Sequence, residues 1–373
     1  MSPPRDKRLF TPGPLTTSPS VKRAMLRDLG SRDGEFLAVV KRVRDRLLAV
    51  AGQAPDGAYE AVLMQGSGTF AVESVLGSVV PRDGRLLILS NGAYGERMVR
   101  IAERLEIVHA VARFSEAAPV SARAVESASG AFSHVAVVHC ETSSGALNPV
   151  AAVAAAARQR GAAVVVDAMS SFGGVPLDPA ADGLDFVVSS ANKCLEGVPG
   201  CAFVVARRDA LAAAEGRARS ISLDLVEQWR GFERDGQFRF TPPTQVLLAL
   251  ERALEELEDE GGVAARARRY QANQACLVQG MRALGFRTFL PDELQSPIIT
   301  AFRYPDDPAF SFDAFYERLA ADGMVIYPGK LLAADCFRIG TIGRLFPSDV
   351  QALLHAVARV IVTPRAVRAA GGG

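Results

Sequence analysis

Two short apolar runs in the middle of the chain limit its possible folds more than any other feature. Residues 163–166 end in Asp167, and residues 186–188 end in a polar segment that reaches Lys193. Short valine-rich runs closed by polar residues are typical of buried parallel strands, and open α/β sheets bind ligands at the carboxyl ends of such strands. An amine and a carboxylate at that edge suit pyridoxal phosphate, which needs a lysine for its Schiff base and an acid beside its pyridine nitrogen.

Both residues also have a common structural alternative. An aspartate at a strand end is usually a turn or capping residue, and a single lysine is usually solvated. The pair alone is therefore a weak signal, and its interpretation depends on what the rest of the chain places at the same edge.

Strand and helix patterns alternate over residues 61–206. Apolar runs predict strands at residues 61–64, 85–89, 135–138, 163–166, 186–188 and 201–206, with a further strand in the segment 107–133. This alternation predicts an α/β fold with a mostly parallel seven-stranded sheet.

The C-terminal third has a different order, of helix, strand, helix, two strands and a last helix, which indicates a smaller α+β domain. We divide the chain into an N-terminal arm (1–18), a large domain (19–260) and a small domain (261–373), with a tail disordered from about residue 364. A long helical stretch over 245–284 is broken at Gly261 and Gly262. The acidic cluster at 255–260 is expected on a solvated face or at a helix end.

Composition excludes several classes of function. The 373-residue chain is 49% hydrophobic and 22% charged, and its net charge of +1 gives no reason to expect a nucleic acid or an acidic membrane as partner. No apolar run approaches the roughly 20 residues of a membrane span, and the first residues show no apolar signal core. Five cysteines without paired metal-ligand spacing favour reduced thiols in the cytoplasm and no metal site.

Further strand ends carry residues that suit a cofactor with a phosphate and a planar ring. Ser67, Gly68 and Thr69 stand between a strand and a helix, where backbone N–H groups and hydroxyls can bind a phosphate. Tyr94, between two glycines, could stack on the ring, and Thr142 could donate to a ring hydroxyl oxygen. The structural alternatives are helix capping at residues 67–69 and packing of Tyr94 against its own helix.

Two arginines are candidates for binding an anionic substrate. Arg338 lies between Phe337 and Ile339 in an apolar strand, where a buried guanidinium needs an anion; the alternative to a substrate anion is a structural ion pair. Arg32, in a polar loop, either meets a second anion or is solvated. Residues 8–17, with two prolines and a glycine, predict an extended segment that either covers the site or is an arm packed on the core.

Several segments, spread over residues 8–358, together resemble the class V aminotransferases of fold type I. These segments are LFTPGPLTT, MQGSGTFAVE, SNGAYGERM, HCETSSGALNP, VDAMSSFGG, SSANKCLEGVPG, FTPPT, SPIITAF, and VIYPGK with DCFRIGTIG. The segments VDAMSSFGG, SSANKCLEGVPG and IYPGK most closely resemble the branch of the family that acts on a phosphonate.

The resemblance implies a role for each candidate residue. Lys193 would form the Schiff base with pyridoxal phosphate and Asp167 would pair with its ring nitrogen, which makes these two the expected catalytic residues. Tyr94 would stack on the ring, and Thr142 would bond the phenolic oxygen. Ser67, Gly68 and Thr69 would bind the cofactor phosphate, and Thr241 of the partner subunit would help them. Arg338 would bind the substrate anion, with Arg32 as a possible second contact.

The resemblance also implies a reaction and an assembly. A homodimer with active sites at its subunit interface would convert 2-aminoethylphosphonate and pyruvate to phosphonoacetaldehyde and L-alanine. A related class V enzyme, such as an alanine–glyoxylate or serine–pyruvate aminotransferase, would share almost every residue named above, so the amino donor stays open. A cysteine desulfurase is disfavoured because Cys336 lies in an apolar strand. A nucleotide-binding module without catalysis would leave Lys193, Asp167 and Arg338 without a joint purpose.

Overall fold

A seven-stranded sheet forms the centre of the protein in the computed structural model, which describes residues 6–55, 57–331 and 334–369. The strand order is β2-β10-β9-β8-β5-β3-β4. β10 is antiparallel to both of its neighbours, and the other four pairings are parallel, which confirms the predicted α/β fold. The strands are β2 (Tyr59–Gln65), β10 (Cys201–Arg207), β9 (Phe186–Ser190), β8 (Ala163–Asp167), β5 (His134–Val138), β3 (Leu86–Ser90) and β4 (His109–Arg113).

Helices cover the sheet because its central strands are apolar on both faces. β3, β5 and β9 are buried at every position, as expected for strands between two layers. Helix α3 packs against β9 and β10, α4 packs against β3, and α6 packs against β8. The helices are α1 (Pro19–Ala24), α2 (Gly34–Val50), α3 (Gly68–Val79), α4 (Ala93–Arg104), α5 (Arg123–Glu126), α6 (Val150–Gln159), α7 (Pro179–Asp182), α8 (Arg208–Ala212), α9 (Leu225–Asp235), α10 (Thr244–Glu260), α11 (Gly262–Ala283), α12 (Phe312–Ala321) and α13 (Pro347–Ala369).

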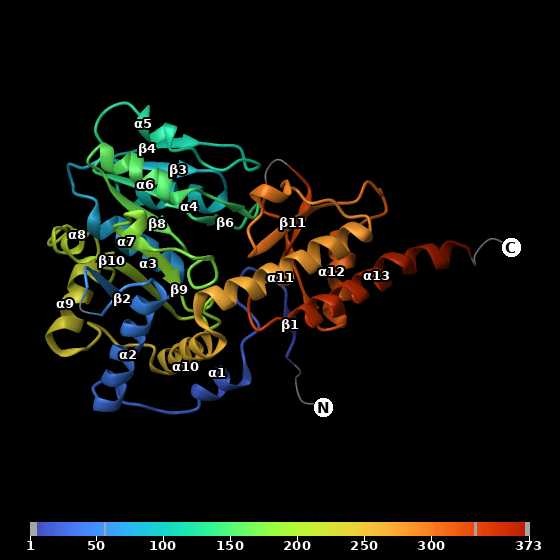
Figure 1. Cartoon of the computed structure of the whole chain (residues 1–373), viewed down its shortest axis with the longest axis horizontal. Coiled ribbons are helices and arrows are strands. Elements are labelled where there is room, and N and C mark those ends of the chain that lie inside the picture. Colours follow the sequence, from blue (N-terminus) through green and yellow to red (C-terminus); the bar gives the residue numbers. More distant parts are fainter. Residues whose placement is uncertain (1–5, 56, 332–333, 370–373) are drawn as a thin grey trace.

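A second core lies in the C-terminal part of the chain. The antiparallel sheet β11-β14-β13 (Ile299–Arg303, Cys336–Gly340 and Tyr327–Pro328) packs with α11, α12 and α13 around a cluster of aromatic side chains that includes Phe337. The long helix α11 runs from the large sheet domain to this smaller part (Figure 1). The predicted division after residue 260 falls at the junction of α10 and α11, where Gly261 has a φ of +101°.

The N-terminal arm joins this second core. Strand β1 (Arg8–Leu9) pairs in parallel with β12 (Met324–Val325), and Phe10 is fully buried in the small core. In Figure 1 the dark blue start of the chain accordingly lies against the red and orange C-terminal elements. The arm then passes between the two cores before it reaches α1, which packs on α10.

Two segments differ from the sequence expectation. The acidic cluster lies at the end of α10, as expected, but Glu256 is buried and accepts a hydrogen bond from Ser18 at 2.7 Å because the N-terminal arm reaches it, and Glu260 pairs with Arg266 at the start of α11. The tail is helical up to Ala369, since alanine and arginine favour helices; residues 370–373 lie outside the described residues. A short hairpin of β6 (Cys140–Glu141) and β7 (Ala146–Leu147) also follows β5.

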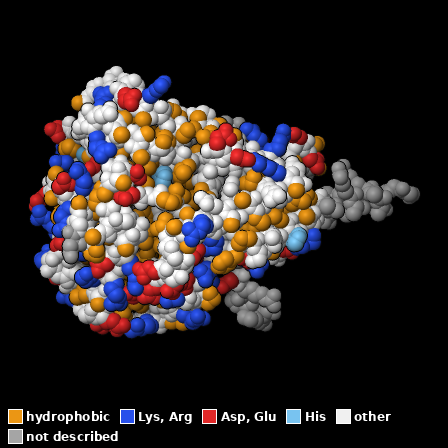
Figure 2. All heavy atoms as spheres, in the orientation of Figure 1, with side chains coloured by type: hydrophobic (Ala, Val, Ile, Leu, Met, Phe, Trp, Pro, Cys, Tyr) orange, Lys and Arg blue, Asp and Glu red, His pale blue; other side chains and the backbone are white. Residues whose placement is uncertain are grey.

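The surface carries charges of both signs. Figure 2 shows Lys and Arg side chains mixed with Asp, Glu and hydrophobic side chains over the visible face, so this face offers no broad patch of one sign for a polyanion. Among the described residues, no helix combines the length and hydropathy that a membrane span needs.

Candidate active site

The carboxyl ends of β8 and β9 meet the first turns of α3 and α4 around a cavity of about 190 Å³. This is the edge of the sheet at which the sequence placed the functional residues. A larger cavity beside α12 and α13 contains none of the predicted site residues. The predicted residues that line the smaller cavity are Ser67, Gly68, Thr69, Tyr94, Asp167 and Lys193.

Lys193 lies in the turn after β9, under the N-terminal arm. Its Nζ donates a hydrogen bond to the carbonyl oxygen of Pro12 at 2.5 Å. A Cβ atom at Gly13 would lie 2.6 Å from the same Nζ, so any other residue at this position would displace the lysine side chain. The structure therefore supports the interpretation that residues 8–17 cover the site. Burial lowers the pKa of Lys193, which favours the neutral amine that a general base requires.

Asp167 is the last residue of β8 and is almost completely buried. One carboxylate oxygen accepts a hydrogen bond from the Met169 backbone N–H at 2.9 Å. Burial raises the pKa of Asp167, and the nearby charges of Arg97 and Lys193 act in the opposite direction. A cation placed in the cavity beside this carboxylate would stabilise its ionised form further.

The first turn of α3, a 12-residue helix, has no side-chain cap from its N-cap residue, Ser67. The capping alternative is therefore not supported. The free N–H groups at a helix N-terminus and the helix dipole both favour a negative group there. Arg97 adds a positive charge, since its Nη1 donates to the Thr69 hydroxyl at 3.0 Å.

Tyr94 is held at the start of α4 by a buried acid. The Glu141 carboxylate accepts hydrogen bonds from the backbone N–H groups of Tyr94 and Gly95 at 3.1 and 3.3 Å. These contacts cap the helix and fix the tyrosine backbone beside the cavity. Glu141 therefore supports the site from behind.

Several cations surround the Tyr94 ring. The Arg97 guanidinium carbon lies 4.8 Å from the ring centroid and Lys330 Nζ lies 5.2 Å from it. Burial on its own would raise the pKa of the Tyr94 phenol, but the charge of Lys193, the nearby Thr142 hydroxyl and the charges of Lys330 and Arg338 lower it below its usual value. The phenol thus marks a region of positive potential beside Lys193.

Arg338 is buried on β14, with only 2% of its surface exposed. Its Nη1 donates to the Thr142 carbonyl at 2.8 Å and its Nε to the Pro328 carbonyl at 3.0 Å. Among the described residues it forms no ion pair, so the structural alternative for this arginine is not supported. The Thr142 hydroxyl oxygen is also buried, and it has no hydrogen-bond partner in the described part of the chain.

Four predicted residues are not among those that line the cavity, namely Thr142 and Arg338, which contact each other, and Arg32 and Thr241. Arg32 is exposed in the loop between α1 and α2, and Thr241 is exposed in the loop before α10. The structure therefore does not bring Arg32 to the cavity within one chain. Arg97 was missed by the sequence analysis, although its position three residues after Tyr94 places both on one helix face.

Comparison with known proteins gives consistent matches over almost the whole chain. The model of the family Aminotransferase class-V matches residues 27–310. Proteins named 2-aminoethylphosphonate–pyruvate transaminase from Syntrophobacter fumaroxidans and Salmonella schwarzengrund are 52% and 53% identical, over 93% and 95% of this chain and 94% and 97% of their own.

Solved structures agree with these sequence matches. The alanine–glyoxylate aminotransferase from Nostoc sp. superposes with a TM-score of 0.89 at 26% identity and covers 97% of both chains. The pyridoxamine–pyruvate aminotransferase from Mesorhizobium loti gives a TM-score of 0.88 at 26% identity, covering 96% of this chain and 93% of its own.

Proposed function

The chain belongs to the class V aminotransferases, which use pyridoxal phosphate, and we propose that it transfers the amino group of 2-aminoethylphosphonate to pyruvate. The products are phosphonoacetaldehyde and L-alanine. The observation that carries this proposal is the pair of cations Arg338 and Lys330, which act on the same tyrosine beside Lys193 and, among the described residues, form no ion pair of their own. A phosphonate dianion carries the charge that such a pair would bind.

The cavity residues fit the cofactor. The uncapped start of α3 suits its phosphate, the unpartnered Thr142 hydroxyl suits its phenolic oxygen, and the Asp167 carboxylate suits its protonated ring nitrogen. When bound, the cofactor withdraws electrons from the substrate carbon next to the amino nitrogen.

The chain's own residues would then do the following. Lys193 would hold the cofactor covalently and, once released by the substrate amine, its Nζ would take the proton from that carbon. Its lowered pKa makes the neutral amine available for this step. The carbonyl of Pro12 would hold Nζ in place, and the arm above it would exclude water. Arg338 would orient the substrate by its anionic group, since a guanidinium fork binds phosphonate or carboxylate equally well.

The donor can be tested directly. Initial rates with 2-aminoethylphosphonate, alanine and serine, each at several concentrations with glyoxylate as the common acceptor, give kcat/KM for each donor. We expect 2-aminoethylphosphonate to have the highest value. A higher value for alanine or serine would replace the proposal by the second candidate, an alanine–glyoxylate or serine–pyruvate aminotransferase.

The role of Lys330 offers a sharper form of this test. Lys330→Met removes one cation from beside Tyr94 and leaves Arg338 in place. We expect KM for 2-aminoethylphosphonate to rise more than KM for pyruvate, because the phosphonate dianion loses more electrostatic attraction to the missing cation than the monocarboxylate does. An equal change in both KM values would mean that Lys330 does not distinguish the two anions.

We propose further that two copies share their active sites. Phe70 and Phe240 are large apolar residues that are 51% and 45% exposed, and Thr241 is exposed next to the second of them. Phe70 lies against Gly66, whose N–H donates to the Gly200 carbonyl at 2.9 Å, and Gly200 lies close to Val246 on α10, the helix that follows Phe240. Exposed apolar residues beside a site fit an interface with a second copy.

Subunit mixing tests this arrangement. Lys193→Ala and Thr241→Glu chains would each be inactive alone, but a mixed dimer would contain one site with both native residues. We expect mixing after partial unfolding to restore part of the activity. No restoration, with dimers shown by light scattering, would place Thr241 outside the partner's site.

We also propose that the protein is cytoplasmic, because its five cysteines are all free.

A further inference from the structure

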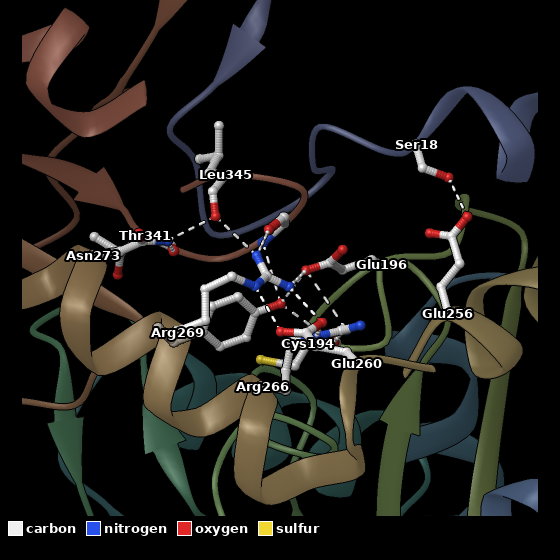
Figure 3. Close-up of polar contacts among 12 residues, drawn as sticks. Ser18, Cys194, Glu196, Glu256, Glu260, Arg266, Arg269, Asn273, Thr341 and Leu345 are labelled. Carbon is white, nitrogen blue, oxygen red and sulfur yellow. Dashed lines mark hydrogen bonds and ion pairs between the residues drawn. The ribbon is translucent and has the colours of Figure 1, made fainter. Parts of the chain in front are cut away.

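A cluster of buried charges surrounds Cys194 and Glu196 (Figure 3), which follow Lys193 closely in the chain. Glu196 is three residues after the lysine and only 2% exposed, and Arg266 on α11 is fully buried. Arg269 and Tyr270, one turn further along α11, complete the cluster together with Glu260 at the end of α10. None of these residues lines the cavity, so the reaction does not use them directly.

One side of this cluster holds the lysine turn. The Glu196 carboxylate accepts hydrogen bonds from Arg269 Nη2 at 2.6 Å and from the Tyr270 hydroxyl at 2.7 Å. The carbonyl of Cys194, which follows Lys193, accepts from Arg266 Nη1 at 2.7 Å. Glu196 has a φ of +62°, a left-handed conformation that a non-glycine residue keeps only when its surroundings impose it.

The other side of the cluster holds the segment after Arg338. Arg269 Nη1 donates to the carbonyls of Gly343 and Leu345 at 2.7 and 2.8 Å. These residues follow β14, the strand that carries Arg338. One guanidinium is therefore bonded both to the turn of the catalytic lysine and to the loop behind the anion-binding arginine.

We propose that Arg269 and Glu196 are positioning residues, which together set the distance between Lys193 Nζ and the Arg338 guanidinium. The inference rests on the proposed function, in which Lys193 takes a proton from a substrate that Arg338 holds. Buried ion pairs rarely add stability over well-packed apolar residues, so stability alone is a weak reason for this cluster. The substrate would meet Lys193 at its amino end and Arg338 at its anionic end, so its reaction requires a fixed distance between these two residues.

The test compares Glu196→Gln with a matched control. Glu60→Gln also neutralises a buried glutamate that pairs with two arginines, Arg44 and Arg208, but at the opposite end of the sheet. The holoenzymes are compared in melting temperature, in kcat and KM for pyruvate, and in the pH midpoint of the visible absorbance band of the bound cofactor. This midpoint needs no turnover.

We expect both variants to melt earlier, but only Glu196→Gln to change the chemistry. Its kcat should fall by about 10²-fold, the effect of misplacing a reacting group by an ångström, with a shifted absorbance midpoint and little change in KM for pyruvate. Arg269→Lys should lower kcat and also raise KM, because it releases Gly343 and Leu345 as well.

The opposite result is equally specific. A Glu196→Gln protein that melts early but keeps its kcat and its absorbance midpoint would show a merely structural ion pair and overturn the proposal. If Glu196→Gln does not fold, Tyr270→Phe removes one hydrogen bond to Glu196 and keeps the ring, and the same pattern should appear in weaker form. If the wild-type protein does not transaminate, the proposed function fails, while the absorbance midpoint still tests positioning.

Discussion

Replacing Gly13 by alanine should disable the enzyme without unfolding it. Gly13 has a φ of +127°, and a Cβ atom there would lie 2.6 Å from Lys193 Nζ and 2.8 Å from its Cδ and Cε. Carbon and nitrogen atoms that do not bond to each other stay well beyond 3 Å apart. The lysine side chain is the flexible partner in this contact, so it must leave its position and lose its hydrogen bond to Pro12.

The cost in stability and the cost in rate can be separated. An alanine forced into this backbone region destabilises the fold by about 1–3 kcal/mol, which lowers the melting temperature by a few degrees. The displaced amine should lower kcat by about 10²-fold, because the base no longer meets the substrate carbon at reacting distance. KM for pyruvate should change little, because the three atoms nearest to a Cβ atom at Gly13 all belong to Lys193 and none to Arg338.

The matched control is Gly216→Ala. Gly216 also has a positive φ, +72°, but a Cβ atom there meets nothing within 4 Å. The Gly216→Ala protein should therefore lose stability to a similar extent but keep the wild-type kcat. Steady-state rates and thermal melting of the two variants decide the matter. If Gly13→Ala retains the wild-type kcat, the arm does not position Lys193 and the reasoning fails.

Three further predictions concern the site and its pH dependence. Arg338→Lys should raise KM for pyruvate by about ten- to a hundredfold in steady-state assays, because it loses one charge-assisted hydrogen bond of about 1.5–3 kcal/mol; an unchanged KM would place the anion elsewhere. Asp167→Asn should lower kcat by about 10²- to 10³-fold, as expected when a fixed charge is removed from a reacting centre, and near-normal turnover would exclude its contact with the ring nitrogen. Burial lowers the pKa values of His134 and His139 to about 4, whereas the unfolded chain binds these protons below about pH 6.5. The free energy of unfolding should therefore fall as the pH drops from 6.5 towards 4, by up to about 3 kcal/mol per histidine; urea titrations at several pH values check this, and His134→Gln should flatten the curve.

The strands and the main site residues could be predicted because their signals are local. Runs of valine that end in a polar residue specify both a buried strand and what stands at its carboxyl end. This rule placed Asp167 at the end of β8 and Lys193 in the turn after the neighbouring strand β9. The glycines around Ser67 likewise marked the turn before α3.

The supporting residues could not be predicted, because their partners are far away in the sequence. Glu256 accepts a hydrogen bond from Ser18, which is 238 residues away in the sequence, and Glu196 accepts one from Arg269, which is 73 residues away. In the sequence, Glu256 is one of several acids at a helix end, and nothing local distinguishes it from its solvated neighbours. Only packing of the arm and of α11 against the lysine turn shows which charges are buried.

The most direct test of this account is to locate the amine that binds the cofactor. The purified protein is incubated with pyridoxal phosphate, reduced with borohydride and digested, and the labelled peptide is identified by mass spectrometry. The account predicts a visible absorbance band that reduction bleaches and one label, on Lys193. A label on another lysine, or none, would contradict it.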